Sequence, residues 1–146
     1  MQVDFGNVEY LYHGSQYLFD VVRPHKAYGE NGSCSLFAIY ASDVLDWVIP
    51  FALPIRWFPD NPSGKRIFTC NEGRTTIDYG SLDPHGIGYV YKMKVESFTK
   101  IDNWQWISER EVVPDEIIRI QVYDYWHTVT FSREAEKINR ELYKYQ

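Results

Sequence analysis

The chain has 146 residues, and this length fits a single core, so we expect residues 1–146 to form one domain that needs no disulfide or metal staple. Its composition, 45% hydrophobic and 24% charged, excludes disordered and collagen-like proteins. The formal net charge is −5, and the chain has no run of Lys or Arg. Because nucleic-acid-binding proteins usually carry clustered positive charge, no nucleic-acid partner is expected.

The order of residues along the chain predicts where the protein is located and whether it binds a metal. No basic stretch followed by an apolar one opens the chain, so we expect a cytoplasmic protein without a secretory signal. The longest apolar run, residues 47–55, is about half a membrane span, and no membrane association is expected. Cys34 and Cys70 stand outside any CxxC or His/Cys cluster, which predicts reduced packing residues and no metal site.

Short runs of β-branched and aromatic residues, separated by turn residues, predict strands along most of the chain. In chain order they cover residues 10–12, 36–39, 66–69, 89–95 and 117–123. Residues 89–95 alternate in polarity, which is typical of a half-buried strand. Because strands dominate and helices are few, we predict an α+β fold.

Two segments have the three- and four-residue spacing of apolar side chains that indicates a helix. The first covers residues 42–53, with Ser42 as its N-cap and Pro50 expected to shorten or kink it. The second follows Ser132 as N-cap and is expected to close the domain. Its apolar positions are Ala135, Ile138, Leu142 and Tyr145.

Three segments rich in Gly, Pro, Asn and Asp predict long loops, at residues 25–33, 59–65 and 71–86. Loops of this length in a compact domain are either functional or mobile. No internal repeat or linker divides the chain, so the loops belong to the single domain.

The sharpest motif is Tyr12-His13-Gly14-Ser15, at the end of the first predicted strand. A His at this place can present a ring nitrogen at the mouth of a cleft, and the following Gly lets another group approach the backbone closely. The alternative is a structural His satisfied by a neighbouring carbonyl. For His13 alone, that alternative is favoured.

A second motif joins the strand ending at Tyr40 to the first helix. Phe51 follows Tyr40 by eleven residues, about three helical turns, so the two rings are placed to line one side of a cleft. Two such rings can sandwich a heteroaromatic ligand. Taken alone, the pair is better explained as part of an aromatic core.

The third motif, Glu109-Arg110-Glu111, precedes a strand-like run at residues 112–113. In an extended segment Glu109 and Glu111 share a face. Either carboxylate could project into a pocket and stabilise positive charge there. A solvated turn is the more common outcome for this segment by itself.

Together, the three motifs resemble the His-Tyr-Glu pattern of the diphtheria-toxin-like and poly(ADP-ribose)-polymerase-like ADP-ribosyltransferases. The resemblance covers the first third of the chain in detail and the region around residues 109–113 loosely. It implies a split β-sandwich whose cleft binds NAD+ as substrate. It further implies cleavage of the nicotinamide–ribose bond and transfer of ADP-ribose to an unidentified acceptor, for example a protein.

The resemblance also implies a role for each motif residue. His13 would bond a ribose hydroxyl of NAD+, with Gly14 and Ser15 contacting the nicotinamide end. Tyr40 and Phe51 would stack on the nicotinamide ring, Phe51 standing where the family has a second Tyr.

The catalytic carboxylate would be Glu111, which adjoins residues 112–113, or Glu109. It would bond the ribose 2′-hydroxyl and stabilise the oxocarbenium-like transition state. Glu109-Arg110-Glu111 also resembles the Glu-x-Glu loop of the arginine-modifying branch, although His13 replaces the leading Arg of that branch. The choice between Glu109 and Glu111 therefore stays open.

Two other functions stay open at this point. One is a non-catalytic module with the same fold, which would hold a nucleotide or a protein ligand in a degenerate cleft. A cleft without a carboxylate within reach of the ribose would favour it. The other is NAD+-dependent removal of a 2′-phosphate from RNA, which the scattered Arg residues and the acidic pI near 5.3 disfavour.

Overall fold

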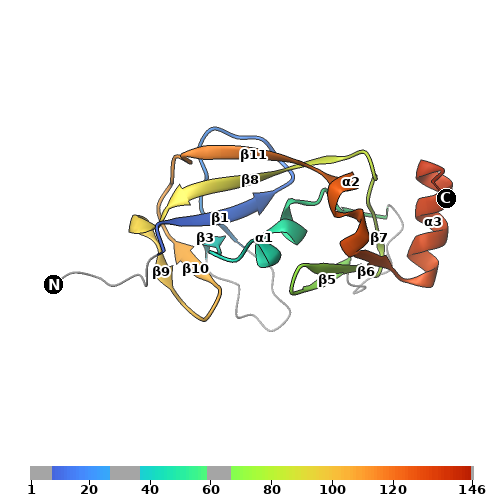
Figure 1. Ribbon diagram of the computed structural model, residues 1–146, viewed down its shortest axis with the longest axis horizontal. Helices are drawn as coiled ribbons and strands as arrows, with labels where there is room; N and C mark the ends of the chain where they lie inside the picture. Colours follow the sequence, from blue (N-terminus) through green and yellow to red (C-terminus); the bar gives the residue numbers. More distant parts are fainter. Residues whose placement is uncertain (1–7, 27–36, 59–66, 146) are drawn as a thin grey trace.

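The computed structural model describes residues 8–26, 37–58 and 67–145. Over these residues the fold is α+β, as predicted, with mostly antiparallel sheets and a few helices (Figure 1). The predicted loop at residues 59–65, most of the one at 25–33, and Cys34 lie outside the described residues.

The first sheet contains the three long strands that lie side by side in Figure 1. β8 (Ile87–Lys94) is central and pairs antiparallel with β1 (Tyr10–Ser15) and β11 (Glu116–Gln121). The predicted strands at residues 10–12, 89–95 and 117–123 are confirmed as strands, but the last two end earlier than predicted, at Lys94 and Gln121, where short helical segments begin. β8 is buried on both faces at its centre, because Val90 and Tyr91 point into different hydrophobic clusters.

The second sheet has the strand order β2-β3-β10-β9. Its members are β2 (His25–Lys26), β3 (Phe37–Ala41), β9 (Thr99–Lys100) and β10 (Trp106–Ser108). One hydrophobic cluster joins the two sheets, with Leu11 and Tyr91 from the first and Ile39 and Trp106 from the second.

The two sheets also meet through the backbone at the end of β3. Tyr12 and Ser42 exchange two backbone hydrogen bonds, of 2.8 and 3.0 Å. These bonds hold β1 beside β3, so that His13 of the first strand lies next to Tyr40 of the second.

Two smaller sheets lie further along the molecule. One joins β5 (Phe68–Asn71), β6 (Arg74–Ile77) and β12 (Val129–Phe131), and the other pairs β4 (Arg56–Trp57) with β7 (Gly80–Ser81). The expectation of one loop over residues 71–86 was therefore wrong for residues 71–81, whereas residues 82–86 form a loop as expected. Glu72 and Gly73 both have positive φ, as a two-residue hairpin turn requires, and this turn keeps the flanking residues in strands.

α1 (Leu45–Ala52) begins three residues later than predicted and ends two residues after Pro50. Ser42 is not its N-cap, because the Ser42 hydroxyl instead accepts the Val44 N–H at 3.0 Å in a turn before the helix. Pro50 cannot donate a helical hydrogen bond, which is consistent with a short helix.

Two glycines allow α1 to lie against β1 and β8 (Figure 1). A Cβ on Gly14 would stand 2.5 Å from the Val48 carbonyl oxygen, and a Cβ on Gly88 would stand 1.7 Å from that of Ala52. Both neighbours are backbone atoms of the helix. No side chain can occupy these positions unless α1 moves away from the sheet.

The C-terminal part carries the remaining helical segments. They are η1 (Val95–Ser97), α2 (Val122–Tyr125), η2 (Trp126–Thr128) and α3 (Arg133–Tyr143). Ser132 caps α3 as predicted, since its hydroxyl accepts the Ala135 N–H at 3.1 Å.

The inward face of α3 differs from the predicted stripe at two positions, one of which, Tyr145, lies beyond the end of the helix at Tyr143. Leu142 is 56% exposed, whereas Asn139 is fully buried. The Asn139 amide accepts the Leu82 N–H at 2.9 Å and donates to the Gly80 carbonyl at 3.0 Å. Asn139 is thus held by hydrogen bonds to β7 and to the residue after it, and not by an apolar contact. The spacing of apolar residues in the sequence cannot indicate a buried polar side chain of this kind.

Among the described residues, no helix is long and apolar enough to cross a membrane. The same ranges contain no group of three or more His, Cys, Asp or Glu side chains placed to hold a metal ion. Cys70 is a free, half-buried thiol in β5 whose pKa is raised by burial.

Candidate functional site

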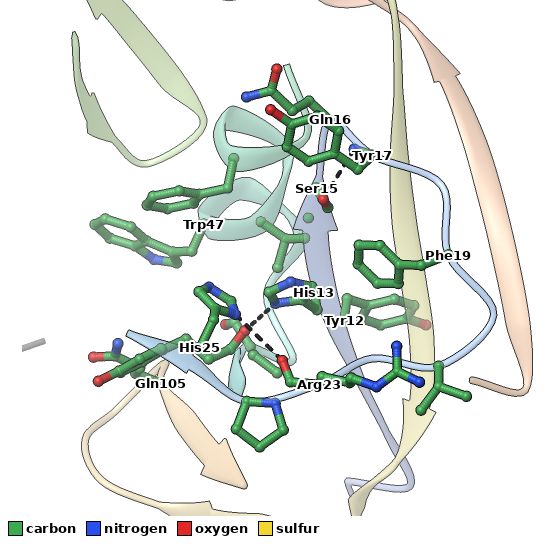
Figure 2. Close-up of a pocket in the computed structure, with 18 of the residues that line it drawn as sticks. Tyr12, His13, Ser15, Gln16, Tyr17, Phe19, Arg23, His25, Trp47 and Gln105 are labelled. Atoms are coloured by element: carbon green, nitrogen blue, oxygen red, sulfur yellow. Dashed lines mark hydrogen bonds between the residues drawn. The ribbon is translucent and has the colours of Figure 1, made fainter. Parts of the chain in front are cut away.

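A cavity of about 720 Å³ lies between β1, β3, α1 and the turn that precedes β10 (Figure 2). All five residues predicted to bind NAD+ line it. They are His13, Gly14, Ser15, Tyr40 and Phe51. The structure thus brings together the first two of the three motifs, whose residues are separated by up to 38 positions in the sequence.

His13 is buried, and its Nδ1–H donates to the Tyr40 carbonyl oxygen at 2.7 Å. A carbonyl can only accept, so the proton of the neutral ring is on Nδ1 and Nε2 is left as an acceptor. Burial lowers the pKa of His13 to about 4; the bond to Tyr40 opposes this shift and the nearby His25 adds to it. At neutral pH, His13 is therefore an uncharged hydrogen-bond acceptor.

The ring of His25 lies edge-on to His13, with 5.7 Å between the ring centroids. Figure 2 shows the two imidazoles together at the centre of the cavity, with the side chain of Arg23 extending away from both. His25 is exposed whereas His13 is buried, so the two neighbouring imidazoles differ in their access to solvent.

Gly14 and Ser15 both serve the local structure of the cavity wall. The close approach predicted at Gly14 is made by the backbone of α1. The Ser15 hydroxyl accepts the Tyr17 N–H at 3.1 Å, which begins the segment that leaves β1 along the cavity.

That segment is held by one buried phenol. Tyr91 donates its hydroxyl to the Tyr17 carbonyl at 2.6 Å and accepts the Phe19 N–H at 3.0 Å. The rings of Tyr91 and Phe19 also stack, with 4.5 Å between centroids. The wall formed by residues 16–19 is thus anchored to the centre of β8.

Tyr40 and Phe51 occupy the same cavity from different elements. Tyr40 is half-buried in β3, whereas Phe51 is 51% exposed near the end of α1. The ring of Phe51 meets Phe68 edge-on at 6.1 Å. An exposed aromatic ring on a cavity wall is available for stacking, so the explanation of Phe51 as a core residue was wrong.

Sequence reasoning missed two indoles of the site, Trp47 and Trp104. Their rings stack with centroids 4.3 Å apart and an interplanar angle of 11°. Trp106, two residues further along the chain, is buried in the core, whereas Trp104 is half-buried on the cavity wall. The available signal was Trp47 itself, four residues before Phe51 and therefore on the same helical face.

The two predicted catalytic carboxylates are not among the residues that line the cavity. Both Glu109 and Glu111 are exposed, and Glu111 pairs with Arg23 at 3.1 Å. Their segment is tied to the cavity wall by two backbone hydrogen bonds of 2.9 Å between Val22 and Val112. Residues 112–113 form only this bridge and not the expected strand.

Gln105, which sequence reasoning also missed, directly precedes β10 and lines the cavity. β10 pairs with β3 so that Ile107 lies opposite Tyr40. Asp102 holds the preceding turn, because one of its carboxylate oxygens accepts the N–H groups of Trp104 and Gln105 at 3.0 and 2.8 Å. The sequence signal for this turn was an Asp four residues before the first residue of the strand.

The described wall of the cavity therefore has aromatic rings, two imidazoles, amides and one Arg, and no Asp or Glu. Comparison with protein-family models, curated proteins and solved structures gave no match for the chain. Any function must accordingly be argued from the chemistry of the site.

Proposed function

We propose that the protein binds NAD+ in this cavity and is an ADP-ribosyltransferase-like domain. The observation that carries the proposal is that His13, Tyr40 and Phe51, singled out by the resemblance, line one cavity with Gly14 and Ser15. A volume of about 720 Å³ lies within the range of small-molecule and cofactor sites.

The chemistry of the wall suits a nucleotide that contains a flat ring and ribose hydroxyls. Nε2 of the neutral His13 can accept a hydrogen bond from a ribose hydroxyl. The exposed ring of Phe51 and the half-buried ring of Tyr40 offer surfaces for stacking on nicotinamide.

The architecture is compatible with the split β-sandwich of that family. A hydrophobic cluster joins the sheet β1-β8-β11 to the sheet β2-β3-β10-β9, and the cavity lies where β1 meets β3.

One observation favours the second candidate, a module that binds the nucleotide without turning it over. Departure of nicotinamide leaves positive charge on the ribose, which a carboxylate in the cavity would stabilise. Among the described lining residues there is none, and Gln105 contributes a neutral amide. Transfer to an acceptor would need Glu109 or Glu111 to reach the ligand from its exposed position.

The first experiment measures the thermal midpoint of the wild type and of His13→Gln with and without millimolar NAD+. Binding to the native state at ligand about 100-fold above Kd stabilises by roughly 2.7 kcal/mol, which corresponds to about 5–10 °C for a domain of this size. We expect this shift in the wild type and a smaller one in the variant. An unchanged wild-type midpoint would contradict NAD+ binding.

Nicotinamide release then separates the two candidates. Incubation of the wild type with NAD+ at high protein concentration should leave the dinucleotide intact for the binding module. Accumulation of free nicotinamide would assign the transferase or hydrolase activity instead. The control is His13→Gln at the same concentration.

A further inference from the structure

The stacked pair Trp47 and Trp104 lies on the cavity wall, and the resemblance gives neither residue a role. The two indoles come from α1 and from the turn before β10, and both are half-buried. Neither is a member of the two hydrophobic clusters that hold the sheets and helices together. Their shared position on the cavity wall is therefore not explained by packing of the core.

The backbone segments that carry the two indoles are both held in place by contacts within the protein. Asp102 accepts the Trp104 N–H at 3.0 Å, and the Gln105 carbonyl accepts the Ile101 N–H at 2.9 Å, so the turn is closed on both sides. The helix that carries Trp47 is held in place because the backbone of α1 packs directly against Gly14 of β1. Rigid aromatic groups bind rings without a large loss of conformational entropy.

The pair lies one helical turn from the ring site proposed for nicotinamide. Trp47 and Phe51 are four residues apart in α1, a separation of about 6 Å along the helix axis on the same face. A cavity of about 150 Å³ is enough for one benzene ring, and this cavity has about 720 Å³. The wall therefore offers two aromatic surfaces and the space for more than one ring.

We propose that Trp47 and Trp104 form a second ring subsite, which binds a heteroaromatic base by stacking on the indole pair. The inference rests on the proposed function, because it concerns the same cavity and separates it into two ring sites. The base belongs either to the adenosine half of NAD+ or to a second molecule that binds beside the dinucleotide.

The test uses calorimetric titration of the full chain with AMP, nicotinamide mononucleotide and NAD+. Three variants are compared with the wild type: Trp104→Leu removes one ring of the stack, Trp104→Phe retains an aromatic ring, and Phe51→Leu alters the other ring site. Circular dichroism and the thermal midpoint establish that each variant is folded. Trp104 lies on a turn outside the clusters, so little loss of stability is expected.

We expect Trp104→Leu to raise the Kd of AMP by about tenfold or more, the usual size of a lost base–aromatic stack. Trp104→Phe should retain most of the affinity, and Phe51→Leu should weaken nicotinamide mononucleotide while leaving AMP unchanged. No binding of AMP at millimolar concentration, or equal affinity in the wild type and Trp104→Leu, would overturn the second subsite.

Competition identifies the source of the base. If the subsite holds the adenine of NAD+, saturating NAD+ prevents AMP from binding. If it holds a base of a second molecule, AMP binds to the NAD+-saturated protein with its affinity retained. AMP binding that depends on Trp104, without any binding of NAD+ or nicotinamide mononucleotide, would reject the proposed function and retain the subsite.

Discussion

The predicted site has two parts, one on the wall built from β1 and β3 and the other in the segment of residues 109–111. The two parts differ in burial and in the partners of their side chains. His13 is buried, hydrogen-bonded to Tyr40 and shifted in pKa to about 4. Glu109 and Glu111 are exposed, and Glu111 has a surface ion pair with Arg23. Groups with perturbed pKa values cluster at functional sites, which favours the first region as the functional one.

The largest expected effect comes from disturbing the packing behind the β1 wall. Gly14→Ala would place a methyl group 2.5 Å from the Val48 carbonyl oxygen, and α1 must move with Trp47 and Phe51. We expect a loss of about 3 kcal/mol in the free energy of unfolding, measured by urea titration.

Ser15→Ala is the matched control for Gly14→Ala, because it removes only the hydroxyl that accepts the Tyr17 N–H. Its loss should be about 1 kcal/mol. Equal stability of Gly14→Ala and the wild type would mean that α1 does not depend on this contact.

The second prediction concerns pH. Between pH 6.5 and 4 the unfolded chain takes up a proton at His13 whereas the folded chain keeps the ring neutral, so stability falls as the pH is lowered through this range. The full loss from this group is roughly 3 kcal/mol by pH 4, and above pH 6.5 it contributes none.

The measurement is the free energy of unfolding from pH 4 to 7.5 for the wild type and His13→Gln. The variant should lose stability less steeply on acidification, since the carboxylates contribute equally to both proteins. Parallel pH profiles would show that His13 titrates normally and is not buried as described.

The third prediction concerns a variant that introduces a carboxylate into the cavity wall. If NAD+ is bound as proposed, Gln105→Glu would put negative charge at the wall position before β10, where positive charge develops on the ribose. We expect nicotinamide release to rise by roughly 100-fold over the wild type, measured chromatographically. Gln105→Met, of similar length and without charge, is the control, and bound NAD+ without faster release would refute this assignment.

The smallest effects are expected at the exposed carboxylates themselves. Glu111→Gln breaks a surface ion pair whose side chains are 65% and 62% exposed, so stability should change by less than about 0.5 kcal/mol. Glu109→Gln should behave in the same way. Loss of a measurable nicotinamide release in either variant would restore that residue to the catalytic role that the resemblance implies.

Most of the secondary structure near the site followed from local patterns. The strand before His13, the existence of the strand at residues 89–94 and the Ser132 cap of α3 are confirmed, because each depends on neighbours within a few residues. The half-buried character expected for residues 89–95 was wrong at the centre of β8, where Val90 and Tyr91 on opposite faces are both buried. Errors arose where distant contacts decide. Ser42 exchanges backbone hydrogen bonds with Tyr12 and does not cap α1. The hairpin at residues 71–74 is a different kind of error, because its contacts are local and the turn-forming residues around it were interpreted as one loop.

The sequence by itself determined an α+β chain and the residue types available for a cleft: a His before a Gly, a Tyr at a strand end, and a Phe on the following helix. Only the tertiary structure decided which of them meet. The approach of α1 to Gly14 and the pairing of β10 with β3 brought Trp47, Trp104 and Gln105 onto the wall and left Glu111 outside it. Spacing along the chain fixes the face of one element, whereas a cavity depends on contacts between elements.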